Sequence, residues 1–352
     1  MLKYVVKRVM LMIFVFLVII SMCFILVKLL PDKPPQAQPN SDAYNIIMMR
    51  REALGYNKPL IEQYGIFMTK TLLAIDFSTN TLGEQNRILF GYDLNNNVFV
   101  GGNWGLSEQM YPNHEVWAVF IEKLPPTMLV NIYTMLFAVP IGLALGIYAA
   151  LKKNKWQDHV ISTGVMVLIS VPGYVYCFLI QYILCHKLVE WTGGLFGFPI
   201  QMLPGTNYFS WDMFVSIIPA ILSLGLGTIA GLARYTRAEL CEVLTSEFML
   251  LARTKGLTRG QATVRHALRN SMVPIFPMIL GEFIGIIGGS LIVEQIFGIP
   301  GVGGLYLASI TALDYNFYLL LNSFYTLVGL ASGIVVDLSY GFVDPRIRMG
   351  ER

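Results

Sequence analysis

The sequence predicts an all-α integral membrane protein with six transmembrane helices. Of its 352 residues only 13% are charged and 55% are hydrophobic, and the mean hydropathy is +0.58. A soluble domain has about 25% charged residues, so this chain has too little charge to cover a globule with a solvated surface. The apolar residues also form continuous runs long enough to cross a bilayer as helices, whereas a transmembrane barrel would show short alternating segments.

The first apolar run, about residues 9–30, predicts an anchor helix within residues 1–30. The run is too long for a signal peptide, and the sequence VKLLPDKPPQ that overlaps its end has no small-residue cleavage site. We therefore expect an uncleaved helix, followed by a long extracytoplasmic segment over residues 31–126.

Two features are predicted inside the extracytoplasmic segment. The stretch KPLIEQYGIFMTKTLL carries apolar residues at the spacing of an amphipathic helix, namely Leu60, Ile61, Tyr64, Phe67, Met68 and Leu72. Residues 78–101 contain ILFGY, DLNNN and VFV, which favour a small hairpin. We expect the helix to lie on the outer face of the membrane.

The rest of the chain predicts a five-helix transmembrane core over residues 127–340 and a cytoplasmic tail over residues 341–352. Its apolar runs predict five further spans, at about 127–151, 159–185, 212–233, 272–294 and 317–340. Pro140, Pro172 and Pro219 each lie within one of these runs, and a proline removes a backbone hydrogen bond and kinks a helix. We expect these kinks to face neighbouring helices or a pathway rather than lipid.

Small residues recur at four-residue spacing in four of the predicted spans. The positions are Gly142 and Gly146, Gly227 and Gly231, Gly281, Gly285 and Gly289, and Gly329 and Gly333. Helices in lipid associate through close packing of small residues, so these glycines predict a tightly packed bundle. Such packing does not by itself indicate transport.

The positions of lysine and arginine predict the orientation. The N-terminus carries Lys3, Lys7 and Arg8, and basic residues also follow the second and fourth spans, whereas residues 189–211 and 295–316 contain none. Because basic loops stay in the cytoplasm, both termini and the loop over residues 234–271 are expected to be cytoplasmic.

This predicted loop is longer than a turn between spans requires. Residues 251–270, LARTKGLTRGQATVRHALRN, hold five cations and no acid, with apolar residues between them at helical spacing. We expect short amphipathic helices that are interrupted at Gly256 and Gly260. A structured basic loop suggests a protein partner, and attraction of Arg253, Lys255 and Arg259 to anionic lipid headgroups remains the alternative.

The sequence offers no candidate for catalysis or for a resident cofactor. The cysteines (Cys23, Cys177, Cys185 and Cys241) lack metal-ligand spacing, and the histidines (His114, His159, His186 and His266) form no HExxH motif. The phosphate-binding pattern GxxxxGK[ST] is also absent from the sequence. We expect no metal site and no nucleic-acid partner.

Four stretches resemble one family of membrane proteins. The run from Phe248 to Pro274, FMLLARTKGLTRGQATVRHALRNSMVP, resembles the cytoplasmic signature of ABC-importer permeases, in the wording of the dipeptide/oligopeptide branch. MLKYVVKRVM, EQIFGIPGVGGL and VVDLSYGFVDPRIR resemble the start, the segment after the fifth span and the tail of the same branch. The resemblance covers nearly the whole chain except residues 78–101, which look like an insertion.

The resemblance implies the fold of a type I ABC-importer permease, whose cytoplasmic loop docks as a coupling helix on an ATPase. Ala252 and Gly256 hold the small positions of the signature, whereas Leu250, Leu251, His266 and Arg269 depart from it. The residues expected to couple to the ATPase are Ala252, Arg253, Lys255, Gly256, Leu257, Arg265 and His266, although a structural role for His266 remains open. Ala252 and Gly256 would leave a helix turn without bulk, and Gly256 would permit a sharp bend.

The resemblance also implies partners: a second, similar permease, two ATPases and an extracytoplasmic substrate-binding protein, which the 78–101 insertion is a candidate to contact. ATP and Mg²⁺ would bind to the ATPases and not to this chain. The expected cargo is a peptide, and nickel complexes, glycans or peptide antibiotics remain alternatives. A proton-coupled transporter is a more distant alternative, and a membrane-embedded enzyme is disfavoured because the chain lacks a catalytic motif.

Two acids in the predicted spans have different expected roles. Glu282 lies near the middle of the fifth span, where a carboxylate is costly unless it faces water or a partner. It either lines the conduit and holds the amino terminus of a passing peptide, or it is a protonated or paired packing residue. Asp337 lies at the cytoplasmic end of the sixth span, and we expect a structural role near interfacial cations.

Overall fold

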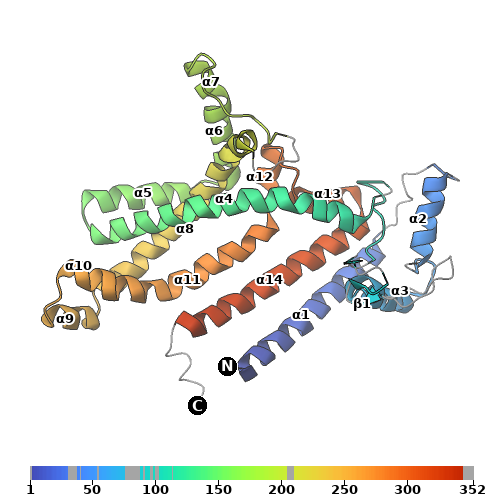
Figure 1. Cartoon of the computed structure of the whole chain (residues 1–352), viewed down its shortest axis with the longest axis horizontal. Coiled ribbons are helices and arrows are strands. Elements are labelled where there is room, and N and C mark those ends of the chain that lie inside the picture. Colours follow the sequence, from blue (N-terminus) through green and yellow to red (C-terminus); the bar gives the residue numbers. More distant parts are fainter. Residues whose placement is uncertain are drawn as a thin grey trace. The chain divides into compact units, whose positions relative to one another are not determined.

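The computed structural model is almost entirely helical and divides into two compact units (Figure 1). Unit 1 contains residues 1–10, 125–303 and 328–352, and unit 2 contains residues 11–124 and 304–327. The structure describes residues 2–30, 38–39, 41–53, 55–75, 88–89, 92–95, 98–99, 103–112, 114–203 and 210–343. The last residues of the predicted cytoplasmic tail, 344–352, lie outside the described residues.

Among the described residues, four helices are long and apolar enough to cross a membrane. They are Val5–Leu29 within α1 (Leu2–Leu29), α4 (Val116–Leu151), α8 (Trp211–Leu244) and Tyr315–Gly341 within α14 (Tyr315–Val343). They contain the first, second, fourth and sixth predicted spans. A bent pair of helices, Trp156–Ser170 and Gly173–Trp191, is the fifth candidate.

The third predicted span is broken rather than continuous. Helix α5 (Trp156–Ser170) is followed by α6 (Gly173–Gln181), η2 (Tyr182–Lys187) and α7 (Leu188–Trp191), and the chain bends by 100° at the break. Pro172 has no N–H to donate to the Leu168 carbonyl, and the Tyr176 hydroxyl donates to that carbonyl instead. Helices α4 and α8 continue through Pro140 and Pro219, so neither of these prolines ends its helix.

The prediction of one helix over residues 272–294 is wrong. Helix α11 (Leu268–Gly285) ends in the short turn η4 (Ile286–Gly288), and α12 (Leu291–Ile296) begins after Gly289. Gly289 has a φ of +68°, a backbone conformation that interrupts a right-handed helix. Helix α8 in turn extends to Leu244, so the first third of the predicted loop 234–271 is helix.

The glycine pairs do not all form packed seams within the chain. A Cβ at Gly142 would lie 2.8 Å from the Leu232 Cβ, and one at Gly146 would lie 2.6 Å from the Thr236 Cβ. These two glycines therefore permit the close contact of α4 with α8, as predicted. A Cβ at Gly281 would make an ordinary 3.5 Å contact with Val336, whereas Gly227, Gly231, Gly285, Gly329 and Gly333 face open space.

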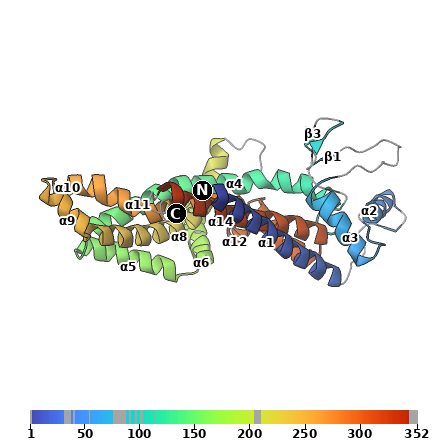
Figure 2. The same cartoon turned by 90° about the horizontal axis from the view of Figure 1, so that it is seen from below.

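The part of the predicted cytoplasmic loop that follows α8 consists of short helices. They are α9 (Glu247–Thr254), α10 (Arg259–Ala262) and η3 (Thr263–Ala267), which leads into α11. Helices α9 and α10 lie together at one end of α8 and α11, away from α6, in both views of unit 1 (Figure 1, Figure 2).

Unit 2 contains the predicted extracytoplasmic elements. Besides α2 (Asp42–Ala53) and α13 (Val302–Ala312, from Gly304 on), it contains α3 (Leu60–Ile66) and η1 (Phe67–Leu72). The last two form the predicted amphipathic helix, in which Phe67 is buried and Ile61 is 80% exposed. The Phe67 ring stacks on that of Phe24 with centroids 4.9 Å apart.

The predicted hairpin is a three-stranded antiparallel sheet in the order β1-β2-β3. Its strands are β1 (Ile88–Leu89), β2 (Tyr92–Asp93) and β3 (Val98–Phe99). Ile88 pairs with Asp93, and Tyr92 pairs with Phe99. The sheet thus confirms the local prediction for residues 78–101, as far as the structure describes them.

Candidate functional site

The turn between α9 and α10 depends on Gly256. This residue has a φ of +89°, in the left-handed region. Its N–H donates to the Arg253 carbonyl (3.0 Å) and the Leu257 N–H to the Ala252 carbonyl (3.4 Å), which is the Schellman arrangement for ending a helix. The predicted bend at Gly256 is therefore confirmed, and its backbone explains why the position requires glycine.

Helix α10 begins directly after this turn with a capping box. The Gln261 N–H donates to Thr258 Oγ1 (3.3 Å), and the Thr258 N–H donates to Gln261 Oε1 (3.1 Å). Gly260 lies inside α10, so the expectation that it interrupts a helix is wrong. The capping box starts the helix before Gly260 and keeps this residue helical.

The inner side of the segment packs on the ends of α4 and α8. Met249, Ala252, Ala262 and Ala267 form one buried cluster with residues of these two helices, namely Ala150, Leu240 and Cys241. Ala252 is only 7% exposed, so it faces this cluster. The idea that Ala252 leaves a smooth outer face for a partner is therefore wrong, because its small side chain serves close packing inside the chain.

The outer side combines large apolar side chains with cations. Leu250 is 66% exposed, Leu251 is 56% exposed and Val264 is 65% exposed. We call these exposed side chains the coupling surface, after the role that the sequence predicts for this loop: Phe248, Leu250, Leu251, Arg253, Lys255, Val264 and Arg265. The sequence predicted Leu250 and Leu251 as apolar positions of an amphipathic helix, but it did not indicate that they would face outward while Met249 and Ala252 face inward.

Two of the predicted coupling residues are partly buried and not fully outward-facing. Leu257 packs against the cluster beneath the segment. His266 is half-buried in η3, and its backbone carbonyl accepts a hydrogen bond from the Asn270 side chain (2.8 Å). Leu257 and His266 are therefore less accessible to a partner than the fully exposed residues of α9.

A buried ion pair connects α5 to α8 near the same end of unit 1. Asp158 is 1% exposed, and its carboxylate accepts hydrogen bonds from Arg237 Nε and from Arg237 Nη2, the latter at 2.7 Å. The Asn154 N–H (2.9 Å) and the Ser162 hydroxyl (3.2 Å) also donate to it. This site was missed in the sequence, where Arg237 counted only toward orientation and Asp158 had no visible partner.

A second buried acid, Glu294, lies in a cradle of glycines. Thr127 Oγ1 donates to Glu294 Oε1 (2.8 Å) and accepts from the Val302 N–H (2.9 Å). A Cβ at Gly289 would lie 2.5 Å from Glu294 Oε1, and one at Gly301 would lie 2.2 Å from Thr127 Oγ1. Within EQIFGIPGVGGL, Gly301 and Gly303 lie against Glu294, a contact that the sequence did not reveal.

The acids singled out in the sequence lie at the surface of unit 1. Glu282 is exposed on α11, and its role in a conduit remains a prediction. Asp337 forms an ion pair with Arg8, with Nη1 and Oδ2 2.9 Å apart. The expected proximity of Asp337 to cations is therefore confirmed.

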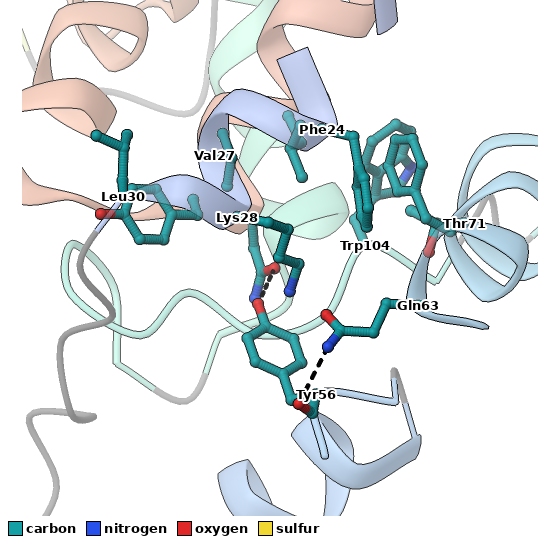
Figure 3. A pocket seen from close by; sticks show the side chains of 12 residues that line it. Phe24, Val27, Lys28, Leu30, Tyr56, Gln63, Thr71 and Trp104 are labelled. Carbon is teal, nitrogen blue, oxygen red and sulfur yellow. Dashed lines mark hydrogen bonds between the residues drawn. The ribbon is translucent and has the colours of Figure 1, made fainter. Parts of the chain in front are cut away.

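Unit 2 contains a cavity of about 200 Å³ (Figure 3). The Lys28 ammonium lies over the Tyr56 ring, 3.6 Å from its centroid. The Tyr56 hydroxyl donates to Asn316 Oδ1 (3.3 Å), and Gln63 Nε2 donates to the Tyr56 carbonyl (3.2 Å). The other walls are largely apolar, from Phe24, Val27, Leu30, Phe67, Trp104 and Leu319. Nothing in the sequence had indicated this cavity.

Together these features define an all-helical, multi-pass membrane protein with four or five candidate spans and a packed segment at the end of its core. Residues 142–349 match the family model of the binding-protein-dependent transport system inner membrane component. Residues 1–131 match the model of the N-terminal part of such membrane components. The chain belongs to this family, and it is therefore an ABC-transporter permease of the inner membrane with no catalytic role.

Curated relatives match over the full length. The glutathione transport system permease protein GsiC of Salmonella choleraesuis (strain SC-B67) is 30% identical over 350 residues, with 99% of each chain covered. The protein of the same name from Escherichia coli (strain K12) is 29% identical over 350 residues, again with 99% of each chain covered.

Solved structures of ABC transporters resemble the chain loosely. An inward-facing MetNI methionine ABC transporter matches with a TM-score of 0.47 and 16% identity, covering 63% of this chain and 97% of that chain. An amino acid ABC transporter with histidines gives a TM-score of 0.46 and 18% identity, covering 63% of this chain and 92% of that one.

Proposed function

We propose that this permease carries peptides inward and is driven by ATPases that dock on its coupling surface. In this proposal six segments cross the membrane, the fifth being α11, and both termini lie in the cytoplasm. The chain pairs with a second, similar permease, two ATPases and an extracytoplasmic binding protein. It binds no cofactor itself, and ATP and Mg²⁺ stay on the ATPases.

The coupling surface carries this proposal. Its apolar side chains are exposed. Burial of apolar surface is the main favourable term in protein association, so a docked partner that covers these side chains would be stabilised. The cations around them suit an acidic rim on a partner and favour orientation and fast association more than affinity. A cytoplasmic protein with an apolar cleft and acidic edges is therefore the expected partner.

The packing beneath this surface supports a mechanical role. The buried cluster joins α9, α10 and η3 to the ends of α4 and α8, and the Asp158–Arg237 ion pair joins α8 to α5. Close-packed interiors transmit displacement because they have low compressibility. Closure of the ATPases on ATP binding would therefore move these spans together and open the conduit outward, and hydrolysis would reset it.

Peptides are the proposed cargo because of the relatives. The permeases named for glutathione transport match the whole chain at about 30% identity, and the sequence resembles the dipeptide/oligopeptide branch. Uptake of labelled dipeptides, tripeptides, pentapeptides and glutathione, compared with nickel, in a deletion strain tests this choice. Loss of nickel uptake alone would contradict a peptide cargo.

The docking role is tested by site-directed crosslinking in native membranes. A cysteine placed at Leu251 should crosslink to an ATP-hydrolysing subunit, because Leu251 is exposed on α9. A cysteine at Leu195, which is 80% exposed beyond α7, is the matched control and should give no such product. If only the control position reaches an ATPase, or neither does, the proposal fails.

A further inference from the structure

The cavity of unit 2 contains a buried acceptor that is held in a fixed orientation (Figure 3). Gln63 Nε2 donates to the Tyr56 carbonyl (3.2 Å) and to the Lys58 carbonyl (2.8 Å). These two acceptors identify which end of the amide is the nitrogen, so the other end is the oxygen. Gln63 Oε1 is buried, and among the described residues it has no hydrogen-bond donor. A buried acceptor without a donor is costly, so we expect water or a bound molecule to donate to it.

The cavity has room for more than a single water molecule. Its volume is about 200 Å³, whereas a site for one water needs only about 10–15 Å³. Two other polar side chains that line it are already bonded. Thr71 Oγ1 donates to the Asn103 carbonyl (2.9 Å), and Asn316 Nδ2 donates to the Leu106 carbonyl (3.0 Å). Gln63 Oε1 is therefore the acceptor that would orient a ligand.

The walls of the cavity differ in polarity from one side to the other. The apolar walls come mainly from the end of α1 and the first turns of α14, with two aromatic rings added: Phe24, Val27, Leu30, Leu319, Phe67 and Trp104. The polar side comes from the chain after α2, where Tyr56 precedes α3 and Gln63 lies in α3. In Figure 3, Tyr56 and Gln63 lie across the cavity from Val27 and Leu30. A ligand that fills the cavity must therefore be amphipathic.

The cavity lies where two candidate membrane spans end. The span Val5–Leu29 ends one residue after Lys28, and the span Tyr315–Gly341 begins at a residue that lines the cavity. Tyrosine side chains at the ends of spans lie at the level of the lipid headgroups, and lysine side chains reach toward that level. Leu30 lines the cavity and is 49% exposed, so the apolar side of the cavity continues onto exposed apolar surface. A lipid molecule can therefore reach the cavity from the surrounding bilayer.

The charge at the cavity is positive. The described residues that line it include the cation Lys28 and no acid. The Lys28 ammonium lies 3.6 Å from the centroid of the Tyr56 ring and 5.7 Å from that of the Phe24 ring, and these contacts hold the charge in place. An ammonium has three N–H donors, so it can contact a bound anion while it lies on the rings. The cavity thus favours an anionic ligand over a cationic one.

Three classes of occupant differ in what they offer to these walls. A neighbouring apolar helix, or an acyl chain alone, brings no donor for Gln63 Oε1. A soluble peptide or sugar has donors, but its polar groups would lose water against Val27 and Leu30 without gaining new partners. An anionic phospholipid with a hydroxyl group in its headgroup offers a donor, a negative charge and a hydrocarbon chain. This class of lipid matches the acceptor, the cation and the apolar walls together.

We propose that the cavity of unit 2 binds the headgroup of an anionic phospholipid that carries a hydroxyl group, as phosphatidylglycerol does. The phosphate contacts the Lys28 ammonium, the hydroxyl donates to Gln63 Oε1, and an acyl chain leaves the cavity past Leu30. Basic pockets between transmembrane helices attract anionic headgroups through the same charge interaction. This lipid site is separate from the transport of cargo, and the proposed orientation places it in the extracytoplasmic leaflet.

The first test separates the hydroxyl from the charge. Lipids with identical acyl chains are titrated onto the full-length permease in its purified complex, and bound lipid is counted by native mass spectrometry. Phosphatidylglycerol should bind with a Kd about tenfold lower than phosphatidylmethanol, which keeps the anionic phosphate but has no hydroxyl donor. Phosphatidylmethanol should in turn bind about tenfold more tightly than phosphatidylcholine, whose headgroup has no net charge. Equal binding of the three lipids would overturn the inference.

The second test assigns each preference to its residue. Gln63→Leu should abolish the preference for phosphatidylglycerol over phosphatidylmethanol and keep that for phosphatidylmethanol over phosphatidylcholine. Lys28→Met should do the reverse. Because each preference is a ratio of two affinities, a general loosening of the fold would not reproduce this exchange. If both variants keep both preferences, or lose all binding with unchanged ratios, the assignment to this cavity is wrong.

The third test fills the cavity. Val27→Phe should remove the tightest phosphatidylglycerol site, because Val27 lines the cavity and is only 4% exposed. Leu26→Phe is the matched control on the same helix, because Leu26 is 57% exposed and lies outside the lining, and it should leave binding unchanged. Equal effects of the two variants would contradict a site in this cavity. The ratios measured for Gln63→Leu and Lys28→Met decide the question if Val27→Phe does not assemble.

A last comparison distinguishes a lipid from a free solute. Glycerophosphoglycerol has the headgroup of phosphatidylglycerol without acyl chains, and it should bind at least about tenfold more weakly because the apolar contacts are lost. Equal binding would identify a site for soluble phosphodiesters and overturn the assignment to a lipid. None of these measurements involves cargo or ATP, so their failure leaves the proposed function intact, whereas the absence of any ATPase from the purified complex would contradict the proposed function alone.

Discussion

Arg237 on α8 and Asp158 on α5 form a two-pronged ion pair in which the carboxylate is 1% exposed and Arg237 Nη2 lies 2.7 Å from Asp158 Oδ2. The pair ties the first turn of α5 to α8, which leads into α9. Since a buried charge without its partner is strongly destabilising, this pair is expected to hold this end of unit 1 together.

Asp158→Asn should therefore lower the stability of the purified permease by about 2 kcal/mol, because Arg237 loses its counter-charge while its side chain stays partly covered. Thermal unfolding followed by tryptophan fluorescence measures this loss. Glu190→Gln, which breaks the exposed pair between Lys187 and Glu190, is the control and should change stability by less than about 1 kcal/mol. Equal effects of the two variants would contradict the structural role of Asp158.

Gly256 and Gly260 should respond in opposite ways to the same substitution. Gly256→Ala should destabilise the segment from α9 to η3 by about 1–2 kcal/mol, because alanine is strained at a φ of +89°. Gly260→Ala should be neutral or stabilising by up to about 1 kcal/mol, because this residue is helical and open. Hydrogen exchange of residues 247–267 measures both effects.

A larger residue at Gly256 should also abolish transport while the chain still inserts in the membrane. The altered turn displaces α10 from α9 and so reshapes the coupling surface. Uptake by cells and membrane insertion are measured on the same Gly256→Leu strain. Uptake that survives this change would show that the shape of the turn is not needed for coupling.

The apolar and the basic parts of the coupling surface should affect different rates. Leu250→Ala and Leu251→Ala should speed dissociation of the ATPase, because each removes apolar area buried on docking. Arg253→Gln and Lys255→Gln should slow association and weaken its dependence on salt. Surface plasmon resonance at two salt concentrations separates the effects. An unchanged salt dependence in the arginine and lysine variants argues against an acidic partner surface.

The cradle of Glu294 gives a steric prediction. Gly301→Ala should destabilise the protein by about 2–3 kcal/mol, because its Cβ would lie 2.2 Å from Thr127 Oγ1 and 2.6 Å from Glu294. Gly304→Ala, at a position where a Cβ meets nothing within 4 Å, should be tolerated. Thermal unfolding of the two variants tests the contrast. A stable Gly301→Ala protein would mean that the contact between Glu294 and Thr127 is not closely packed.

Glu282 is tested by removal of its charge alone. If its carboxylate faces the conduit and meets the amino terminus of a peptide, Glu282→Gln should lower uptake by up to about tenfold without changing the amount of protein in the membrane. Peptides with an acetylated amino terminus should be less affected. Unchanged uptake of every tested peptide would remove Glu282 from the pathway.

Much of this architecture was predictable because it follows from local rules. The long apolar helices, the amphipathic helix with Phe67 and the need for glycine at position 256 depend on composition, periodicity and backbone geometry. The same rules misjudged Gly260, since a capping box between Thr258 and Gln261 outweighs the weak helix propensity of one glycine. The local rules also predicted one continuous helix where α11 and α12 are separate, because hydropathy alone does not detect the positive φ at Gly289.

The sequence by itself determined the class of protein and the family, since these depend on how much apolar chain there is and on the order of short motifs. Only the tertiary structure decided which side of each segment is free. Ala252 faces inward and Leu251 outward, Asp158 meets Arg237 across 79 positions of chain, and Gly231 is open whereas Gly146 is packed. Such contacts depend on neighbours that are distant in sequence, and no local pattern specifies which residues those will be.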